Sequence, residues 1–211
     1  MAHIITIAQQ KGGAGKTTLA VNLAIAFAKQ NQRVAILDTD PQGSLGRWFM
    51  TRRELLGDPG LDFATASAWG VGYECEKLSK TNDIVIIDTP PKVDSDLKPA
   101  LREADLILVP VGSSHVDLWA TDGVLDLAVR VGKRCVIVLN RVKSGTRLAD
   151  EVATAAGEIA ADVATTSLGQ RVVYAETLGQ GRAALEAGKS AAFDEVTALA
   201  AEVMALLPVK E

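Results

Sequence analysis

The residues with the clearest chemical potential form one stretch near the amino terminus, Lys11-Gly12-Gly13-Ala14-Gly15-Lys16-Thr17-Thr18. Its glycines would let backbone N–H groups curve around a polyphosphate without Cβ clashes, and a following helix would add partial positive charge. Lys16 would reach the β- and γ-phosphates, and the hydroxyl of Thr17 would bind Mg²⁺. The standard pattern requires glycine at position 10, but the chain has Gln10 there, followed by a second lysine, Lys11. We therefore predict a nucleotide-binding phosphate loop over residues 11–18.

An apolar segment on each side supports this prediction. Residues 3–8 have the pattern of a buried strand, and residues 19–28 carry the apolar and small side chains of a packed helix. Strand, glycine-rich turn and helix together are the context in which a phosphate-binding loop works. The alternative is a glycine-rich turn with incidental lysines.

Acidic residues end two further apolar segments. Residues 33–37 run into the sequence D-T-D-P-Q, and strand alternation would point Asp38 and Asp40 the same way unless the turn has begun. Two such carboxylates beside a phosphate loop are costly without a metal ion, a lysine or water. Residues 84–87 end in Asp88, which would hold Mg²⁺ through water, because Mg²⁺ gives up its waters reluctantly. For the first pair, the alternative is an acidic turn that ends the strand at a proline.

A base-recognition site is predicted after the apolar segment 136–139. The side-chain amide of Asn140 offers both a donor and an acceptor, as an adenine edge requires. We expect Asn140 and the adjacent Arg141 to bind the nucleotide. The alternative is that Asn140 simply starts a turn.

These residues lie at the ends of apolar segments that alternate with helical patterns. The alternation predicts a mostly parallel, twisted sheet with helices on both faces, where ligands bind beyond the carboxyl ends of the strands. The expected strands cover residues 3–8, 33–38, 83–88, 105–111 and 134–140, with weaker candidates at 62–65 and 162–165. No linker, repeat or low-complexity segment is visible. We therefore expect a single α/β P-loop NTPase domain over residues 1–211.

Composition narrows the class of protein. The 211 residues include 48% hydrophobic but only 4% aromatic residues, so aliphatic side chains must fill the core. The net charge of −4 argues against a protein that is basic all over, but not against a local basic patch. Cys75 and Cys135 form no CxxC or Cys/His cluster, so zinc and iron–sulfur sites are not expected. Met1 leads directly into the first strand and no apolar stretch approaches the roughly 18 residues of a membrane helix, so we expect a cytoplasmic protein.

The motifs together resemble those of the ParA/MinD superfamily of ATPases. The form K-G-G-x-G-K-T-T at 11–18 resembles that family's deviant Walker A box, D-x-D-P-Q at 38–42 its A′ motif, and D-x-P-P at 88–91 its Walker B region. The later sequence Q-R-V-V-Y at 170–174 resembles the small plasmid partition ATPases of the ParF type, so the likeness covers nearly the whole chain. We see no amino-terminal helix-turn-helix extension like that of the longer partition ATPases, and operator-specific autoregulation is not implied.

The resemblance also implies roles for these residues. Lys11 would reach across a dimer interface to the nucleotide of the second subunit, and Asp40 would position the attacking water. The implied catalytic residues are Lys11, Lys16 and Asp40, and the implied Mg²⁺ residues are Thr17, Asp38 and Asp88. The implied cofactors are ATP and Mg²⁺.

The leading hypothesis is a ParA-like ATPase that forms a homodimer on ATP, binds non-specific DNA of the nucleoid and positions a cargo such as a plasmid, a chromosome origin or a protein cluster. A ParB-like or cargo-adaptor protein would stimulate hydrolysis. One alternative is a MinD-like, membrane-associated ATPase, but the tail 194–211 carries four acidic residues and one lysine, which anionic lipid should repel. Another is a metabolic ligase on the same scaffold.

Any DNA-binding surface of this acidic chain must gather scattered cations onto one face. The candidates are Lys143, Arg147 and Arg171, with Arg182 and Lys189 behind them. Comparable regions of partition ATPases carry arginines that touch DNA, although Gly145 stands where an arginine is expected. The alternative is an ordinary solvated surface. Solvated and partner-contacting interpretations also compete for the arginines that follow the A′ motif, Arg47, Arg52 and Arg53.

Overall fold

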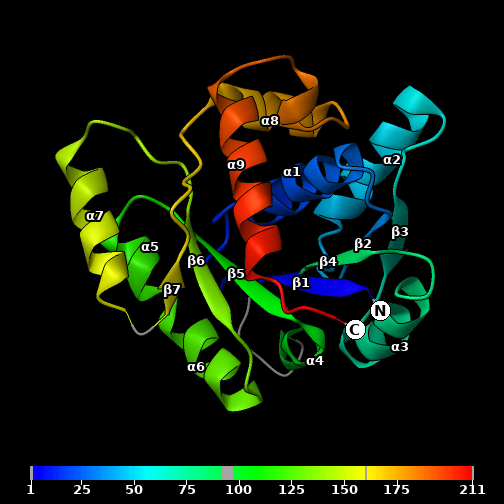
Figure 1. Ribbon diagram of the computed structural model, residues 1–211, viewed down its shortest axis with the longest axis horizontal. Helices are drawn as coiled ribbons and strands as arrows, with labels where there is room; N and C mark the ends of the chain where they lie inside the picture. The colour runs from blue at the N-terminus through cyan, green and yellow to red at the C-terminus, as the bar shows by residue number, and fades with distance from the viewer. Residues whose placement is uncertain (1, 92–96, 160, 211) are drawn as a thin grey trace.

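The computed structural model describes residues 2–91, 97–159 and 161–210 (Figure 1). They form one seven-stranded sheet in the order β3-β2-β4-β1-β5-β6-β7, in which every pair of neighbouring strands is parallel. The strands are β1 (His3–Ile7), β2 (Val34–Asp38), β3 (Asp62–Thr65), β4 (Ile84–Asp88), β5 (Leu106–Val111), β6 (Cys135–Leu139) and β7 (Asp162–Val163). Every segment that the sequence marks as a strand forms one, and the predicted α/β fold is confirmed.

Helices cover both faces of the sheet (Figure 1). They are α1 (Lys16–Lys29), α2 (Ser44–Leu56), α3 (Val71–Leu78), α4 (Leu97–Glu103), α5 (His115–Trp119), α6 (Asp122–Val131), α7 (Arg147–Gly157), α8 (Val172–Gly179) and α9 (Ala191–Leu206), with short 3-10 turns at Ala68–Gly70 and Ala184–Glu186. The helices α1, α2, α8 and α9 bury apolar residues against one face. The helices α3, α4, α6 and α7 cover the other.

Helix α1 lies at the centre of the first face. Every residue from Leu19 to Phe27 is buried, as expected of a helix that is apolar on nearly all sides. The packing of α1 against α9 and β4 fixes the amino end of α1 just after β1, at the carboxyl edge of the sheet.

The apolar face of α9 belongs to the same core. Val196, Leu199 and Val203 are buried in the cluster that includes α1. A membrane-binding role for this tail would therefore require α9 to leave the core. Glu211, the last residue of the tail considered above, lies outside the described residues. In the part of the chain that the structure describes, no helix has both the length and the apolar character needed to cross a membrane.

The register of the sheet brings the ends of three strands level. Asp88 at the end of β4 pairs with Ile7 at the end of β1 and with Asp38 at the end of β2. Two carboxylates and the turn that leads into α1 are thereby placed together, although 71 residues separate Thr17 from Asp88 in the chain.

Candidate nucleotide-binding site

The turn between β1 and α1 has the backbone of an anion-binding loop. Gly13 and Gly15 have φ values of +76° and +95°, which L side chains rarely adopt. A Cβ atom on Gly15 would lie 2.3 Å from Nδ2 of Asn140, so glycine is required there for two reasons. Gly15 also has no side chain to cap α1, so the N–H groups of the first helical turn remain for a bound anion.

Lys16 is buried at the start of α1, an unusual position for an ammonium group. Its side chain donates a hydrogen bond to the carbonyl oxygen of Gln9 at 3.1 Å. Burial lowers the pKa of Lys16, and the negative charges of Asp88 and Asp40 partly oppose that effect. The lysine is therefore held in a dry site where an additional negative group, such as a phosphate, would stabilise its charge.

Thr17 and Asp88 form the second part of the site. The Thr17 hydroxyl donates to Oδ2 of Asp88 at 2.6 Å. Oδ1 of Asp88 is buried and has no hydrogen-bond partner among the described residues. Burial raises the pKa of Asp88 to about 7, against the hydrogen bond from Thr17. A buried carboxylate oxygen that lacks a partner, beside a hydroxyl group, fits a hydrated Mg²⁺ ion, which takes oxygen ligands.

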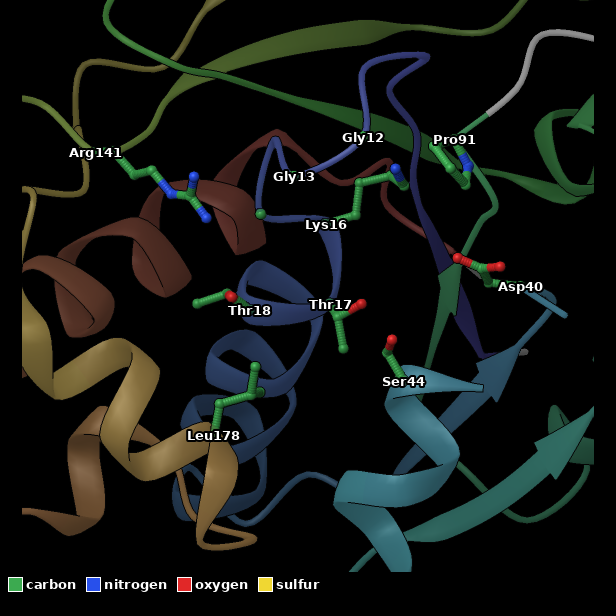
Figure 2. A pocket seen from close by; sticks show the side chains of 11 residues that line it. Gly12, Gly13, Lys16, Thr17, Thr18, Asp40, Ser44, Pro91, Arg141 and Leu178 are labelled. Atoms are coloured by element: carbon green, nitrogen blue, oxygen red, sulfur yellow. The ribbon is translucent and has the colours of Figure 1, made fainter. Parts of the chain in front are cut away.

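The two aspartates of the D-T-D-P-Q sequence lie in different surroundings, because β2 ends at Asp38 and the turn has begun at Asp40. The buried carboxylate of Asp38 accepts hydrogen bonds from the backbone N–H groups of Asp40 at 3.0 Å and Gly46 at 2.9 Å. Burial raises the pKa of Asp38 despite these bonds. Asp38 thus shapes the turn, whereas Asp40 lines the cavity beside the loop (Figure 2).

A cavity of about 260 Å³ lies between the loop, the turn after β2 and α8. Figure 2 shows Lys16, Thr17 and Asp40 around it. It is lined by Gly12, Gly13, Gly15, Lys16, Thr17, Thr18, Asp40, Ser44, Pro91, Arg141 and Leu178. The structure therefore brings most of the predicted phosphate and metal residues together. The sequence analysis did not predict Ser44, Pro91 and Leu178 as site residues. Ser44 and Pro91 follow the acidic strand ends, which is their only signal in the sequence, and Leu178 has none.

Two predicted residues of the loop, Lys11 and Ala14, line a second cavity of about 360 Å³ on the other side of the glycines. Lys11 forms an ion pair there with Asp117, a residue that the sequence analysis did not select. In the folded chain Lys11 is thus directed away from the phosphate cavity.

Asn140 is buried behind the loop and uses both groups of its amide within the chain. Nδ2 donates to the Ala14 carbonyl at 2.9 Å, and Oδ1 accepts from the Arg141 backbone N–H at 2.9 Å. Asn140 also lines a third cavity, of about 390 Å³, with Tyr174 of α8. Arg141 lines all three cavities and has φ +57°, a strained value for a residue other than glycine.

Two of the three candidate DNA contacts are paired with acids. A parallel bridge between Val142 and Gly169 places the segments that carry Lys143 and Arg171 side by side. Arg171 binds both carboxylate oxygens of Glu195 through Nε, and Arg147 pairs with Glu151. No carboxylate of the described residues pairs with Lys143. The reserve candidates Arg182 and Lys189 are exposed.

The arginines that follow the acidic turn do not form one solvated face. Arg47 and Arg53 are exposed, but Arg52 is buried and pairs with Glu186 at 2.9 Å. A solvated or partner-contacting interpretation of Arg52 is therefore wrong. The helical spacing of α2 turns Arg52 inward, where polar groups of a distant segment meet it.

Comparisons with known proteins identify a nucleotide-binding family. The family model described as CobQ/CobB/MinD/ParA nucleotide binding domain matches residues 5–178. Maintenance of carboxysome distribution protein A of Halothiobacillus neapolitanus is 31% identical over 220 residues, covering 96% of this chain and 97% of that protein. Chromosome partitioning protein ParA of Caulobacter vibrioides is 31% identical over 164 residues, covering 59% of this chain and 60% of that protein.

Solved structures share the fold. The septum site-determining protein MinD of Pyrococcus horikoshii, complexed with Mg-ADP, has a TM-score of 0.80 at 21% identity and covers 98% of this chain, which covers 97% of it. A structure of apo McdA from Cyanthece has a TM-score of 0.79 at 18% identity, with coverage of 96% of this chain and 100% of that chain.

Proposed function

Because the chain belongs to the CobQ/CobB/MinD/ParA nucleotide-binding family, we propose that it is a single-domain ATPase that uses ATP-driven dimerisation to position a cargo on DNA. The observation that carries the ATPase assignment is that Lys16 and Thr17 line one cavity beside a glycine loop, and that the Thr17 hydroxyl donates to Asp88 behind it. The likeness to a carboxysome distribution protein over nearly its whole length favours a protein assembly as the cargo over a plasmid or a chromosome origin.

ATP and Mg²⁺ are the proposed cofactors, and the residues present fit both. Thr17 and Asp88 would hold Mg²⁺, the latter through its buried oxygen without a partner, and Asp38 would support them from behind. Bound Mg²⁺ would neutralise charge on the β- and γ-phosphates. The backbone N–H groups of the loop and the first turn of α1 would bind the phosphates.

Three side chains have separate proposed tasks in hydrolysis. Lys16 neutralises the charge that develops on the transferred phosphoryl group, and its burial strengthens that interaction. Asp40, at the cavity edge, orients the attacking water. Lys11, which does not line this cavity, acts on the nucleotide of the second subunit.

The third cavity is the proposed base site. It adjoins Thr18 at the phosphate end and extends to Tyr174 on α8. Because Asn140 already uses Nδ2 and Oδ1 within the chain, only the second N–H and the second lone pair of its amide remain for a base. Arg141 would contact the nucleotide from the rim.

Non-specific DNA is the proposed track, and the surface around Lys143 and Arg171 the proposed contact. Glu151 and Glu195 neutralise two of the three candidate cations, so each subunit offers a weak patch that a dimer would double. A ParB-like or cargo-adaptor protein would stimulate hydrolysis and reset the monomer. The same cycle predicts cytoplasmic protein that associates with the nucleoid when ATP is bound.

The DNA proposal is tested by retention of the protein on random-sequence DNA with ATP and Mg²⁺ across a salt series. Binding should require ATP, weaken steeply with salt and ignore base sequence. Lys143→Ala/Arg171→Ala should weaken retention, whereas the matched double change Lys77→Ala/Lys80→Ala, at and beyond the end of α3, should not. Equal retention by both double variants would reject this patch.

The same protein also separates the alternatives. If ATP drives sedimentation with anionic liposomes and no DNA retention, the membrane interpretation replaces the DNA one. If ATP drives neither, and hydrolysis requires a small organic acid or amide, a metabolic ligase is the better description. Chelation of Mg²⁺ with EDTA should abolish hydrolysis in every case.

A further inference from the structure

Lys11 is held in place by a contact that the proposed cycle does not use. Its ammonium group pairs with Oδ1 of Asp117 on α5, and the two side chains are 40% and 21% exposed. The carboxylate of Asp117 is itself fixed, because Oδ2 accepts a hydrogen bond from the Ser114 hydroxyl at 2.5 Å. Oδ2 also lies close to Gly112, where a Cβ atom would be 2.6 Å away. The acceptor is therefore positioned before Lys11 reaches it.

The neighbouring residue of the loop is docked on the same part of the chain. Gln10 stands where the standard phosphate loop has glycine, and its side-chain amide lies against Gly123 at the start of α6. A Cβ atom on Gly123 would be 2.0 Å from Nε2 of Gln10. Two successive residues before the glycines thus lie against the stretch from α5 to the start of α6.

This arrangement opposes the task proposed for Lys11. Lys11 and Asp117 both line the second cavity. To reach the nucleotide of a second subunit, the ammonium group of Lys11 must therefore leave Asp117. We propose that Asp117 is a positioning residue that retains Lys11 within its own subunit and competes with the partner-bound nucleotide for it. The inference rests on the proposed dimerisation and adds a residue that raises the dissociation constant of the dimer.

The size of the effect follows from the type of ion pair. A partly exposed pair contributes up to about 1 kcal/mol, which is about fivefold in an equilibrium constant. Each subunit of the dimer would break one such pair. Removing the competition should therefore tighten the dimer by up to about 25-fold, since the two free energies add.

The test measures the dimer dissociation constant by sedimentation with Mg²⁺ and AMPPNP, so that hydrolysis does not enter. Asp117→Asn keeps the shape of the side chain and removes the charge, and it should dimerise more tightly than the wild type. Asp126→Asn removes an equal charge from an exposed position on α6 and should match the wild type. In a Lys11→Ala background, Asp117→Asn should give no gain.

A second measurement follows Lys11 itself. Acetylation of Lys11 by a soluble active ester, quantified by mass spectrometry on the nucleotide-free monomer, should rise up to about fivefold in Asp117→Asn. The same site should be protected in the AMPPNP dimer of either protein. A purely structural role for Asp117 would not change the reactivity of this one amine selectively.

Two results would overturn the inference. One is a dissociation constant of the Asp117→Asn dimer that is equal to or higher than that of the wild type, whatever the cause of the weaker dimer. The other is an equal gain from Asp117→Asn when Lys11 is absent, because the effect would then be general electrostatics. If the wild type itself fails to dimerise with AMPPNP, the proposed function fails first, and Lys11 acetylation in the monomer still decides whether Asp117 restrains it.

Discussion

Replacing Arg52 with alanine should destabilise the protein, because Arg52 joins two of the elements that form the phosphate cavity. Ser44 at the start of α2 and Leu178 on α8 both line that cavity. Arg52, further along α2, joins these two elements: its guanidinium donates to both carboxylate oxygens of Glu186 at 2.9 Å and to the Gly181 carbonyl at 3.2 Å, just beyond α8. Its removal leaves a partly buried carboxylate without its cation.

The expected magnitude follows from this burial. Breaking a buried ion pair on one side costs about 3–5 kcal/mol. The lower end applies here, because the side chain of Glu186 is 20% exposed while that of Arg52 is 7% exposed. For a chain of this length, about 3 kcal/mol corresponds to a melting temperature lower by about 6–12 °C.

Urea and thermal denaturation followed by circular dichroism would measure this change. The neighbouring exposed arginine gives the control, and Arg53→Ala should stay within about 0.5 kcal/mol of the wild type. Arg52→Met/Glu186→Leu should recover most of the loss, because an apolar pair leaves no charge unpaired. If Arg52→Ala unfolds like Arg53→Ala, or the double variant is no better than Arg52→Ala, the reasoning is refuted.

Three further changes test other parts of the account. Gly15→Ala should lower nucleotide affinity by at least about tenfold in calorimetry, because the added Cβ meets Asn140 and the positive φ is strained by roughly 1–3 kcal/mol; unchanged affinity would contradict the loop geometry. Burial raises the pKa of Glu195, but hydrogen bonds, the strongest from Arg171, outweigh burial and hold this pKa below its ordinary value. The ionised Glu195 therefore stabilises the folded state above a pH of about 4.3, and this stabilisation is lost as the pH falls through the lowered folded-state pKa. The melting temperature of Glu195→Gln should accordingly fall less than that of the wild type when the pH is lowered below this value. An equal fall in the two proteins would refute the assignment. Lys11→Ala should lose hydrolysis while the monomer still binds nucleotide, and normal phosphate release would exclude a role for Lys11.

The fold and the phosphate loop were predictable from local patterns. The five inner strands of the sheet coincide with apolar runs, and Asp88 ends one of them, as its place in the sequence indicated. Contacts between distant segments were not predictable in the same way. The Asn140 amide donates to the Ala14 carbonyl, 126 residues away, and Lys11 pairs with Asp117, 106 residues away. No spacing rule relates such residues, because the topology of the sheet alone brings them together.

The same limit applies to the candidate DNA surface. The sequence marks Lys143 and Arg171 as cations but not the acids that face them, since Glu195 belongs to a helix at the far end of the chain. Helical spacing could have indicated that Arg52 faces inward, because it lies on the same side of α2 as the apolar Trp48 and Phe49. Its buried partner, in contrast, required the folded structure.

The central claim, an ATP-driven dimer whose phosphate-binding and water-orienting residues are distinct, is tested most directly by light scattering during size-exclusion chromatography with ATP and Mg²⁺. The account predicts that Lys16→Ala remains at the mass of one chain, because the phosphates lose their buried cation. Asp40→Ala should bind ATP and accumulate at the mass of two chains, because hydrolysis no longer resets the dimer. A monomeric Asp40→Ala together with a dimeric Lys16→Ala would contradict the account.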